Sequence, residues 1–240
     1  DFRKIVNGLD KLPLSKFGLT TNGIHLEREL EFLKGTSLRY LNISLDSLNK
    51  ENFERITQTN TFSRVYHSIV KAHSLGFKVK VNAVLLRGIN DTEEELNQFV
   101  EFTQKTGIEV RFLELMRIGV ANNYFEKHFV SAGEIIEKLQ LENQLEDKEM
   151  PKDSTSFNFY LSNGGEIGFI ASESRPFCGH CSRLRLGADG ALRPCLFMDH
   201  GLSLRGLKGE DFLKTLKQTV KLKPFNRIDT VGQAMHQIGG

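Results

Sequence analysis

The sequence predicts an α/β protein in which parallel β/α units are followed by a smaller part of different organisation. In the first half, short apolar strand-like runs alternate with amphipathic helical stretches, and the connections between them are short. This alternation is typical of parallel β/α units. In the second half, a hairpin signal and a cluster of cysteines replace it. We place the boundary near residues 120–130, and we count fewer units than a complete eight-unit barrel requires.

The first half contains four predicted strands and three predicted helical stretches. Leu41, Ile43 and Leu45 alternate with polar residues, which is the period of a strand. Asp91 is followed three residues later by Glu94, so we expect Asp91 to cap the third helix and Gly107 to end it. The strands are expected at residues 17–20, 39–45, 78–86 and 109–115, and the helical stretches at 26–33, 51–75 and 91–105.

The second half shows three further local signals. Ser131 is expected to begin a helix that runs to about Leu139, and the polar residues 143–156 are expected to form a loop. Two apolar runs flank Ser-Asn-Gly-Gly at 162–165, which predicts a β-hairpin of residues 157–161 and 166–170. Residues 210–222 carry apolar side chains at helical spacing, so a helix is predicted there.

Composition narrows the class of protein. The 240 residues include 32 Lys and Arg against 30 Asp and Glu, and a net charge of only +2 gives no support for nonspecific binding to nucleic acid or to membranes. No apolar run approaches the roughly 20 residues that a membrane helix needs. The three cysteines indicate a reducing compartment. We therefore expect a cytoplasmic protein without a nucleic-acid or membrane partner.

All three cysteines lie within eighteen residues of the second half. Cys178 and Cys181 form a C-x2-C turn, and Cys195 follows after thirteen intervening residues. A closed structural metal site uses four ligands, so three thiolates leave one position open on a metal or an iron–sulfur cluster. Arg183 and Arg185 lie between the cysteines and suggest an anionic ligand, because the planar guanidinium binds phosphate in a bidentate manner.

Other interpretations of the cysteines stay open at this point. A Cys3His zinc site could take His180 or His200 as its fourth ligand, and the C-x2-C pair could form a redox disulfide. Three unrelated buried thiols would not cluster so closely, and an odd cysteine count in a chain of this size disfavours a disulfide framework. Spacing alone does not separate zinc from iron–sulfur. A zinc-stabilised nucleotide-binding α/β module without redox activity is therefore the alternative function.

The cysteine run fits the pattern F-C-x2-C-x-R-x-R-L-x-x-D-G-x-L-x-x-C-L-F. This pattern closely resembles the C-terminal cluster motif of the GTP 3′,8-cyclases of molybdenum cofactor biosynthesis, the MoaA family of radical S-adenosylmethionine enzymes. Gly187 stands where the family usually has Thr. Further segments look like family signatures in the family's order, at residues 19–23, 41–46, 79–82, 111–116 and 238–240.

The resemblance implies a fold in two parts. Residues 1–125 would form an incomplete, partial TIM-type β/α barrel whose N-terminal units are missing, and residues 126–240 a smaller α+β domain that carries a 4Fe–4S cluster and binds GTP. The family's C-x3-C-x2-C motif, which holds a second 4Fe–4S cluster and S-adenosylmethionine, is absent from the sequence, as is the G-G-E-P segment after it. We therefore expect this chain alone to bind GTP and the C-terminal cluster without cleaving S-adenosylmethionine.

The resemblance also implies the reaction and its partners. The family converts GTP to (8S)-3′,8-cyclo-7,8-dihydroguanosine 5′-triphosphate, a lyase step on the way to molybdopterin. GTP and S-adenosylmethionine are the expected small-molecule partners. Family members are often dimers, so a homodimer is among the expected assemblies, together with functional coupling to the next enzyme of molybdopterin synthesis.

Family motifs assign roles to individual positions. Arg183 and Arg185 would be catalytic, and they would bind GTP together with Leu184. Asn82 and Arg111 are weaker candidates on the cofactor side. The terminal Gly239 and Gly240 would reach into the active site, where residues without side chains avoid clashes. The other implied ligands are Cys178, Cys181 and Cys195 for the 4Fe–4S cluster, Ser44 and Met116 for S-adenosylmethionine, and Thr20 and Lys80 for GTP.

Without the resemblance, the four strand-end candidates have ordinary explanations. Thr20 could begin a turn, Ser44 could be a solvated strand residue, and Met116 is a common core residue. Lys80 could face solvent on an edge strand, but inside a barrel its charge would be costly unless an anion met it. A triphosphate would meet that need. No catalytic role is expected for the histidines at 25, 73, 128, 180, 200 and 236.

Overall fold

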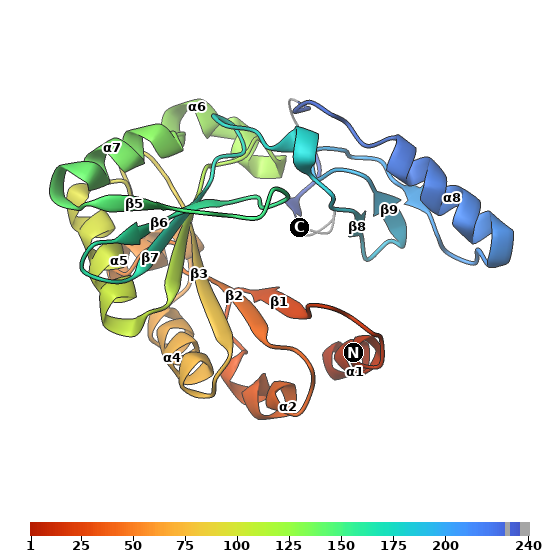
Figure 1. The fold of residues 1–240 in the computed structure, drawn as a ribbon, viewed down its shortest axis with the longest axis horizontal. Helices are drawn as coiled ribbons and strands as arrows, with labels where there is room; N and C mark the ends of the chain where they lie inside the picture. Colours follow the sequence, from red (N-terminus) through yellow and green to blue (C-terminus); the bar gives the residue numbers. More distant parts are fainter. Residues whose placement is uncertain (229–230, 236–240) are drawn as a thin grey trace.

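The computed structural model describes residues 1–228 and 231–235, and within them it shows a mixed α/β fold built on one large sheet (Figure 1). The seven strands of this sheet follow the order β1-β2-β3-β4-β7-β6-β5. The first five in this order run parallel, whereas β6 and β5 are antiparallel to their neighbours. The strands are β1 (Gly18–Thr21), β2 (Tyr40–Ser44), β3 (Lys78–Val84), β4 (Glu109–Leu113), β5 (Leu145–Lys148), β6 (Phe157–Leu161) and β7 (Glu166–Ile170).

Helices cover one face of this sheet. Figure 1 shows α2, α4, α5 and α7 in an arc around its outer side, while the opposite side faces the C-terminal part of the chain. The parallel strands are joined through these helices, as parallel pairing requires. The helices are α1 (Phe2–Asp10), α2 (Leu30–Lys34), α3 (Lys50–Thr57), α4 (Phe62–Ser74), α5 (Glu93–Thr106), α6 (Phe125–His128), α7 (Ala132–Glu142) and α8 (Gly209–Lys221).

The hydrophobic core lies between the sheet and these helices. Alternate strand residues such as Ile43, Val81 and Phe112 are buried and point toward the helices. Phe99 of α5 packs edge-on against Phe112 of β4, with 5.4 Å between ring centroids. Because successive strand residues point to opposite faces, the residues between these apolar positions line the other, concave side of the sheet.

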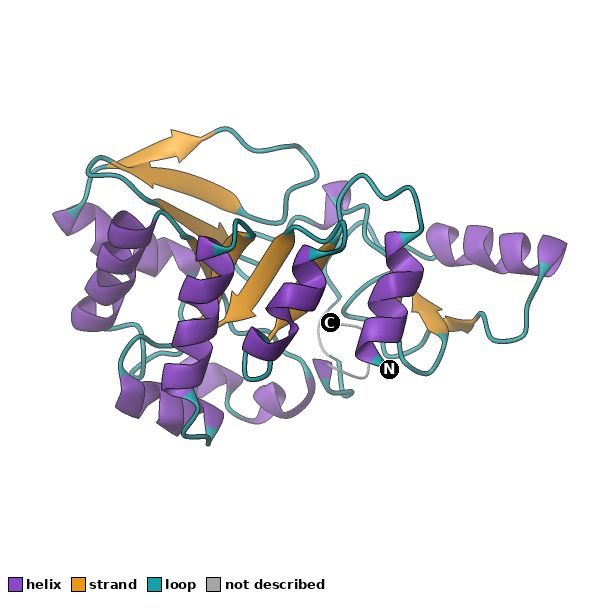
Figure 2. Ribbon diagram, turned by 90° about the horizontal axis from the view of Figure 1, so that it is seen from below, coloured by secondary structure: helices purple, strands orange, loops and turns teal. Residues whose placement is uncertain are grey.

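A second, smaller unit follows the large sheet. Its three antiparallel strands are β8 (Arg185–Leu186), β9 (Ala191–Arg193) and β10 (Leu202–Ser203), in the order β10-β9-β8 among the described residues. Helix α8 contacts β9 and lies far from the large sheet (Figure 1 and Figure 2). The cysteine run connects β7 to this unit, so the cysteines lie where the two parts meet.

Several sequence predictions are confirmed. The four strands of the first half and the hairpin of β6 and β7 are present. Ser131 caps α7 through a complete capping box with Glu134. Gly107 ends α5 with a φ of 71°, a left-handed conformation that favours glycine. The parallel sheet confirms the α/β class, and no helix in the described parts of the chain is long and apolar enough to span a membrane.

Two local predictions were wrong, and a third is confirmed with a break. Thr92, not Asp91, caps α5, because the Thr92 side chain accepts from the Glu95 amide while Asp91 accepts from the Gly88 amide. The helical stretch at 51–75 is confirmed, but it consists of the two helices α3 and α4, and α3 ends at Gln58, whose φ is 55°. The expected loop at 143–156 contains strand β5.

The domain boundary at 125/126 stays a prediction. It falls between β4 and α7, yet β5, β6 and β7 extend the sheet that the first half begins, through the pairing of β7 with β4. The large sheet therefore draws its strands from both predicted parts. Gly239 and Gly240 lie outside the described residues.

Candidate functional site

The register of the parallel strands aligns polar side chains in rows on the concave side of the sheet. Thr20, Asn42, Lys80 and Glu109 are direct neighbours on β1, β2, β3 and β4. The next row toward the strand C-termini is Ser44, Asn82, Arg111 and Gly168 on β2, β3, β4 and β7. Pairing thus brings Ser44 and Arg111, which are 67 positions apart in the sequence, into one row.

The first row is held by hydrogen bonds and ion pairs. Asn42 Nδ2 donates to Thr20 Oγ1 at 3.3 Å. Lys80 Nζ lies 2.5 Å from Glu109 Oε2, and Arg111 Nε donates to Glu109 Oε1 at 2.5 Å. Burial raises the pKa of Glu109, but the charges of Arg111 and Lys80 outweigh it and leave that pKa below its ordinary value. The anion that Lys80 needs is therefore already supplied by Glu109.

In the second row, Asn82 carries an unusual atom. Its Oδ1 is buried and has no hydrogen-bond partner among the described residues. A buried acceptor without a partner costs free energy, and a bound ligand that donates to it would remove that cost. Asn82 lies beside Ser44 in the strand register, so the two side chains offer polar contacts to one ligand.

A cavity of about 220 Å³ joins the cysteine run to the strand ends. Leu113 and Ile170, at the ends of β4 and β7, and Met116, just beyond β4, line one side of it. The buried Oγ of Ser172, also in the lining, has no hydrogen-bond partner in the described parts of the chain. The cavity is also lined by the predicted residues Cys178, Cys181, Cys195, Arg183 and Arg185. Thr20, Ser44, Lys80 and Leu184 do not line this cavity.

The three thiols are free, so the redox disulfide is not formed. Burial raises the pKa of Cys178, and the neighbouring Cys195 and Cys181 raise it further. Burial also acts to raise the pKa of Cys181, but hydrogen bonds from Arg183 outweigh it and lower that pKa. These opposite shifts show that the thiols interact with each other and with the adjacent cations.

The chemistry around the thiols fits an anionic cofactor. Lys223 and Arg227 also line the cavity, and the Arg227 guanidinium lies 3.5 Å from the Phe197 ring centroid. Burial lowers the pKa of Arg185, as expected for a cation that lacks water around it. Thiolates are the usual ligands of iron–sulfur clusters. Among the described residues, no three Cys, His, Asp or Glu side chains converge as they would around a metal ion, and neither His180 nor His200 lines the cavity.

Comparison with protein-family models gives two matches. Residues 1–101 match the Radical SAM superfamily, and residues 108–230 match Molybdenum Cofactor Synthesis C. A GTP 3′,8-cyclase from Synechocystis sp. is 44% identical to this chain over 240 residues, which cover all of this chain and 73% of the relative. The chain belongs to the GTP 3′,8-cyclase family.

Other comparisons agree with this assignment. The GTP 3′,8-cyclase of Aquifex aeolicus is 36% identical to this chain, and the matched region covers 89% of this chain and 67% of the relative. The GTP 3′,8-cyclase of Clostridium botulinum (strain Hall) is 35% identical, and the matched region covers all of this chain and 77% of the relative. Streptococcus suis SuiB bound to precursor peptide SuiA has a TM-score of 0.51 at 13% identity, covering 94% of this chain and 52% of that chain. This structural likeness concerns the fold alone. The family places the chain among the radical SAM enzymes of molybdenum cofactor synthesis.

Sequence reasoning missed a carboxylate that this member of the GTP 3′,8-cyclase family buries beside the cavity. Glu114, directly after β4, is 1% exposed. It accepts from the amides of Ala132 at 2.8 Å, Glu173 at 2.8 Å and Ser174 at 2.9 Å, and from the Ser174 hydroxyl. It therefore ties the end of β4 to the start of α7 and to the segment that leads to Cys178. An acidic residue inside the apolar run Phe-Leu-Glu-Leu-Met was the available signal.

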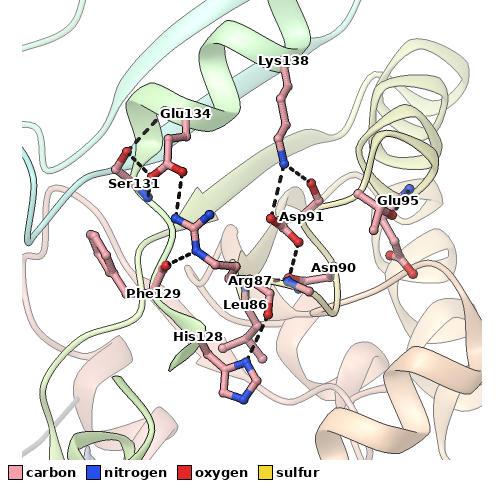
Figure 3. Close-up of polar contacts among 12 residues, drawn as sticks. Leu86, Arg87, Asn90, Asp91, Glu95, His128, Phe129, Ser131, Glu134 and Lys138 are labelled. Carbon is pink, nitrogen blue, oxygen red and sulfur yellow. Dashed lines mark hydrogen bonds and ion pairs between the residues drawn. The ribbon is translucent and has the colours of Figure 1, made fainter. Parts of the chain in front are cut away.

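A second missed residue, Asn90, fixes the loop after β3 (Figure 3). Its side chain donates to the carbonyls of Asp46 at 2.6 Å and Val84 at 2.8 Å, and accepts from the Leu86 amide at 2.7 Å. Asp46 in turn accepts from the Val84 amide at 2.8 Å, and burial raises the pKa of Asp46. These bonds join the ends of β2 and β3, next to Ser44.

The other side chains of this loop bind α7 and the segment before it. Figure 3 shows Arg87 between Glu134 and the Phe129 carbonyl, with distances of 2.7 and 2.9 Å. Lys138 donates to the Asp91 carbonyl at 2.7 Å. The loop is thus tied to the sheet by Asn90 and to the helical layer by Arg87 and Asp91.

Replacing Asn90 by alanine is expected to lower the free energy of unfolding by about 2–3 kcal/mol, because three part-buried backbone groups lose a partner. Chemical denaturation would measure this change. Asn97→Ala is the matched control, since Asn97 makes one exposed hydrogen bond to Glu142, and it should change stability by no more than about 0.5 kcal/mol. Equal effects of the two substitutions would contradict the role of Asn90.

Proposed function

We propose that this chain supplies the GTP-binding part of a radical SAM GTP 3′,8-cyclase that converts GTP to (8S)-3′,8-cyclo-7,8-dihydroguanosine 5′-triphosphate. The observation that carries this proposal is a cavity lined both by three thiols and two arginines of the cysteine run and by residues at the C-terminal ends of β4 and β7. In parallel β/α folds, reacting groups are bound at this end of the strands. The family relationship supports the same reaction.

Cys178, Cys181 and Cys195 are the proposed ligands of a 4Fe–4S cluster, whose fourth iron would supply a binding position for guanine. Arg183 and Arg185 would make charge-assisted contacts with the phosphates, and with the adjacent Leu184 they form the substrate-binding segment. The apolar side chains at the C-terminal ends of β4 and β7 would keep water away from the reacting ribose. The protein thereby orients the purine and the sugar with respect to each other.

The polar rows on the strands are the proposed contacts for S-adenosylmethionine and for part of the nucleotide. Ser44 and Met116 would contact S-adenosylmethionine, with the unpartnered Oδ1 of Asn82 as a further acceptor. Thr20 and Lys80 would contact the nucleotide. A second 4Fe–4S cluster, a homodimer, a cytoplasmic location and coupling to the next enzyme of molybdopterin synthesis belong to the proposal as well.

GTP titration of the anaerobically reconstituted protein tests the nucleotide site. Arg185→Ala is expected to weaken GTP binding by at least about tenfold, because a hydrogen bond from a charged group contributes roughly 1.5–3 kcal/mol. Arg205→Ala is the control: its guanidinium donates to the carbonyls of Asp189 and Ala188, and it does not line the cavity. A protein that takes up iron without binding GTP, or equal affinities of both variants, would contradict the proposed site.

A further inference from the structure

We propose that Glu109 is a positioning residue of the nucleotide site. In the ligand-free protein its carboxylate holds the side chains of Lys80 and Arg111 close together, and a bound polyphosphate then replaces the carboxylate as their partner. The inference rests on the proposed function, and it adds a residue to which the resemblance assigns no role. It concerns the first and second rows of polar residues on the concave face of the sheet.

One carboxylate serves two cations at this point. The Lys80 ammonium and the Arg111 guanidinium each lie 2.5 Å from a different oxygen of Glu109. The side chains of Lys80, Arg111 and Glu109 are only 26%, 17% and 10% exposed. Solvent therefore screens their charges weakly, and the group carries an excess of one positive charge. An anion that reaches this face would be attracted to it.

Glu109 is the fixed member of the group. The buried Asn158 donates to Glu109 Oε1 at 3.0 Å and to Glu166 Oε1 at 2.6 Å. Glu166 in turn pairs with Lys148 at 2.6 Å. Gly168 gives Asn158 the necessary room, because a Cβ at that position would lie 2.8 Å from the Asn158 Oδ1. The carboxylate is thus anchored from the β6 and β7 side.

The two cations, by contrast, have long stems. Lys80 ends in an ammonium on four carbons, and Arg111 points from the row nearer to the strand C-termini. Both can turn toward those ends without a movement of the backbone. Before the ligand arrives, Glu109 offsets the repulsion between them. After it arrives, the phosphate oxygens take the place of the carboxylate.

Replacement of the Glu109 carboxylate by phosphate oxygens has a measurable consequence that a purely structural ion pair would not have. Without the Glu109 charge, the ligand-free protein holds two neighbouring cations that repel each other. A bound polyphosphate removes this repulsion. The stabilisation that the ligand provides should therefore increase in Glu109→Gln, although the ligand-free variant is less stable than the wild type.

Thermal unfolding of the anaerobically reconstituted protein tests this, with GTP, inorganic tripolyphosphate and guanosine as ligands. Glu109→Gln should lower the midpoint of the ligand-free protein by at least about 5 °C, and GTP or tripolyphosphate should raise it more than in the wild type. Guanosine should shift both proteins equally. Glu101→Gln, which removes an exposed partner of Lys105 on α5, is the control and should change neither quantity.

An equal or smaller ligand shift in Glu109→Gln overturns the inference. If this variant does not fold, Lys80→Gln is the deciding variant, because it leaves one cation for one carboxylate. A smaller rise of the unfolding midpoint with tripolyphosphate than in the wild type supports the inference, and an unchanged rise overturns it. A wild-type protein that responds to tripolyphosphate but not to GTP contradicts the proposed function and leaves the inference standing. A wild-type protein that responds to neither overturns both.

Discussion

Cys195→Ala is expected to abolish both iron binding and GTP binding by the anaerobically reconstituted protein. The wild type should take up about four irons per chain, because the three thiolates bind three irons of a 4Fe–4S cluster. Cys195 lines the same cavity as Cys178 and Cys181, and its Sγ accepts from the Phe197 amide at 3.4 Å. The two remaining thiolates cannot hold the cluster, and GTP then loses the iron to which guanine would bind.

Iron and sulfide analysis, followed by GTP titration of the same samples, measures both effects. Cys195→Ser keeps a polar atom for the Phe197 amide, so it separates loss of the thiolate from loss of packing and should behave like the alanine variant. Ser182→Ala, an exposed change within the same run, should retain iron and GTP. Iron content and GTP affinity that stay at the wild-type level in Cys195→Ala would make the cysteine run structural.

Local patterns predicted most of the fold because they depend on neighbouring residues. The alternation around Leu41 and the helix start at Ser131 each depend on a few neighbouring positions, and both predictions were correct. The N-cap at Asp91 was one residue off, because Thr92 follows it and also offers a capping side chain. Strand β5 was missed because its residues Leu-Glu-Asp-Lys lack an apolar pattern, and only pairing with β6 makes them a strand.

Some residues of the candidate site were likewise predictable from local sequence, whereas others were not. Cys178, Cys181 and Cys195, with Arg183 and Arg185 between them, lie within eighteen residues of the sequence, so their spacing alone indicated a metal or cluster site. The ion pair of Lys80 with Glu109 joins positions 29 apart, and it follows from the register of β3 with β4, which no local pattern specifies. Glu114 finds its partners 18 to 60 positions away. Such contacts are consequences of topology, and the sequence shows only that a polar residue interrupts an apolar run.

Glu114→Ala is expected to lower the free energy of unfolding by about 3–5 kcal/mol, since the buried amide of Ala132 and the part-buried amides of Glu173 and Ser174 would lose their acceptor at once. Urea unfolding measures this loss. Glu126→Ala is the matched control: its carboxylate is 82% exposed and pairs with Arg117, so its loss should cost less than about 1 kcal/mol.

Loss of the Glu114 carboxylate is also expected to reduce iron uptake. The amides of Glu173 and Ser174 belong to the segment that joins β7 to Cys178, so the start of the cysteine run is anchored to the end of β4 through this carboxylate. Iron uptake by folded Glu114→Ala, measured at a temperature below its unfolding transition, should therefore fall below that of Glu126→Ala. Full iron uptake together with the expected loss of stability would mean that Glu114 supports the fold without positioning the cluster ligands.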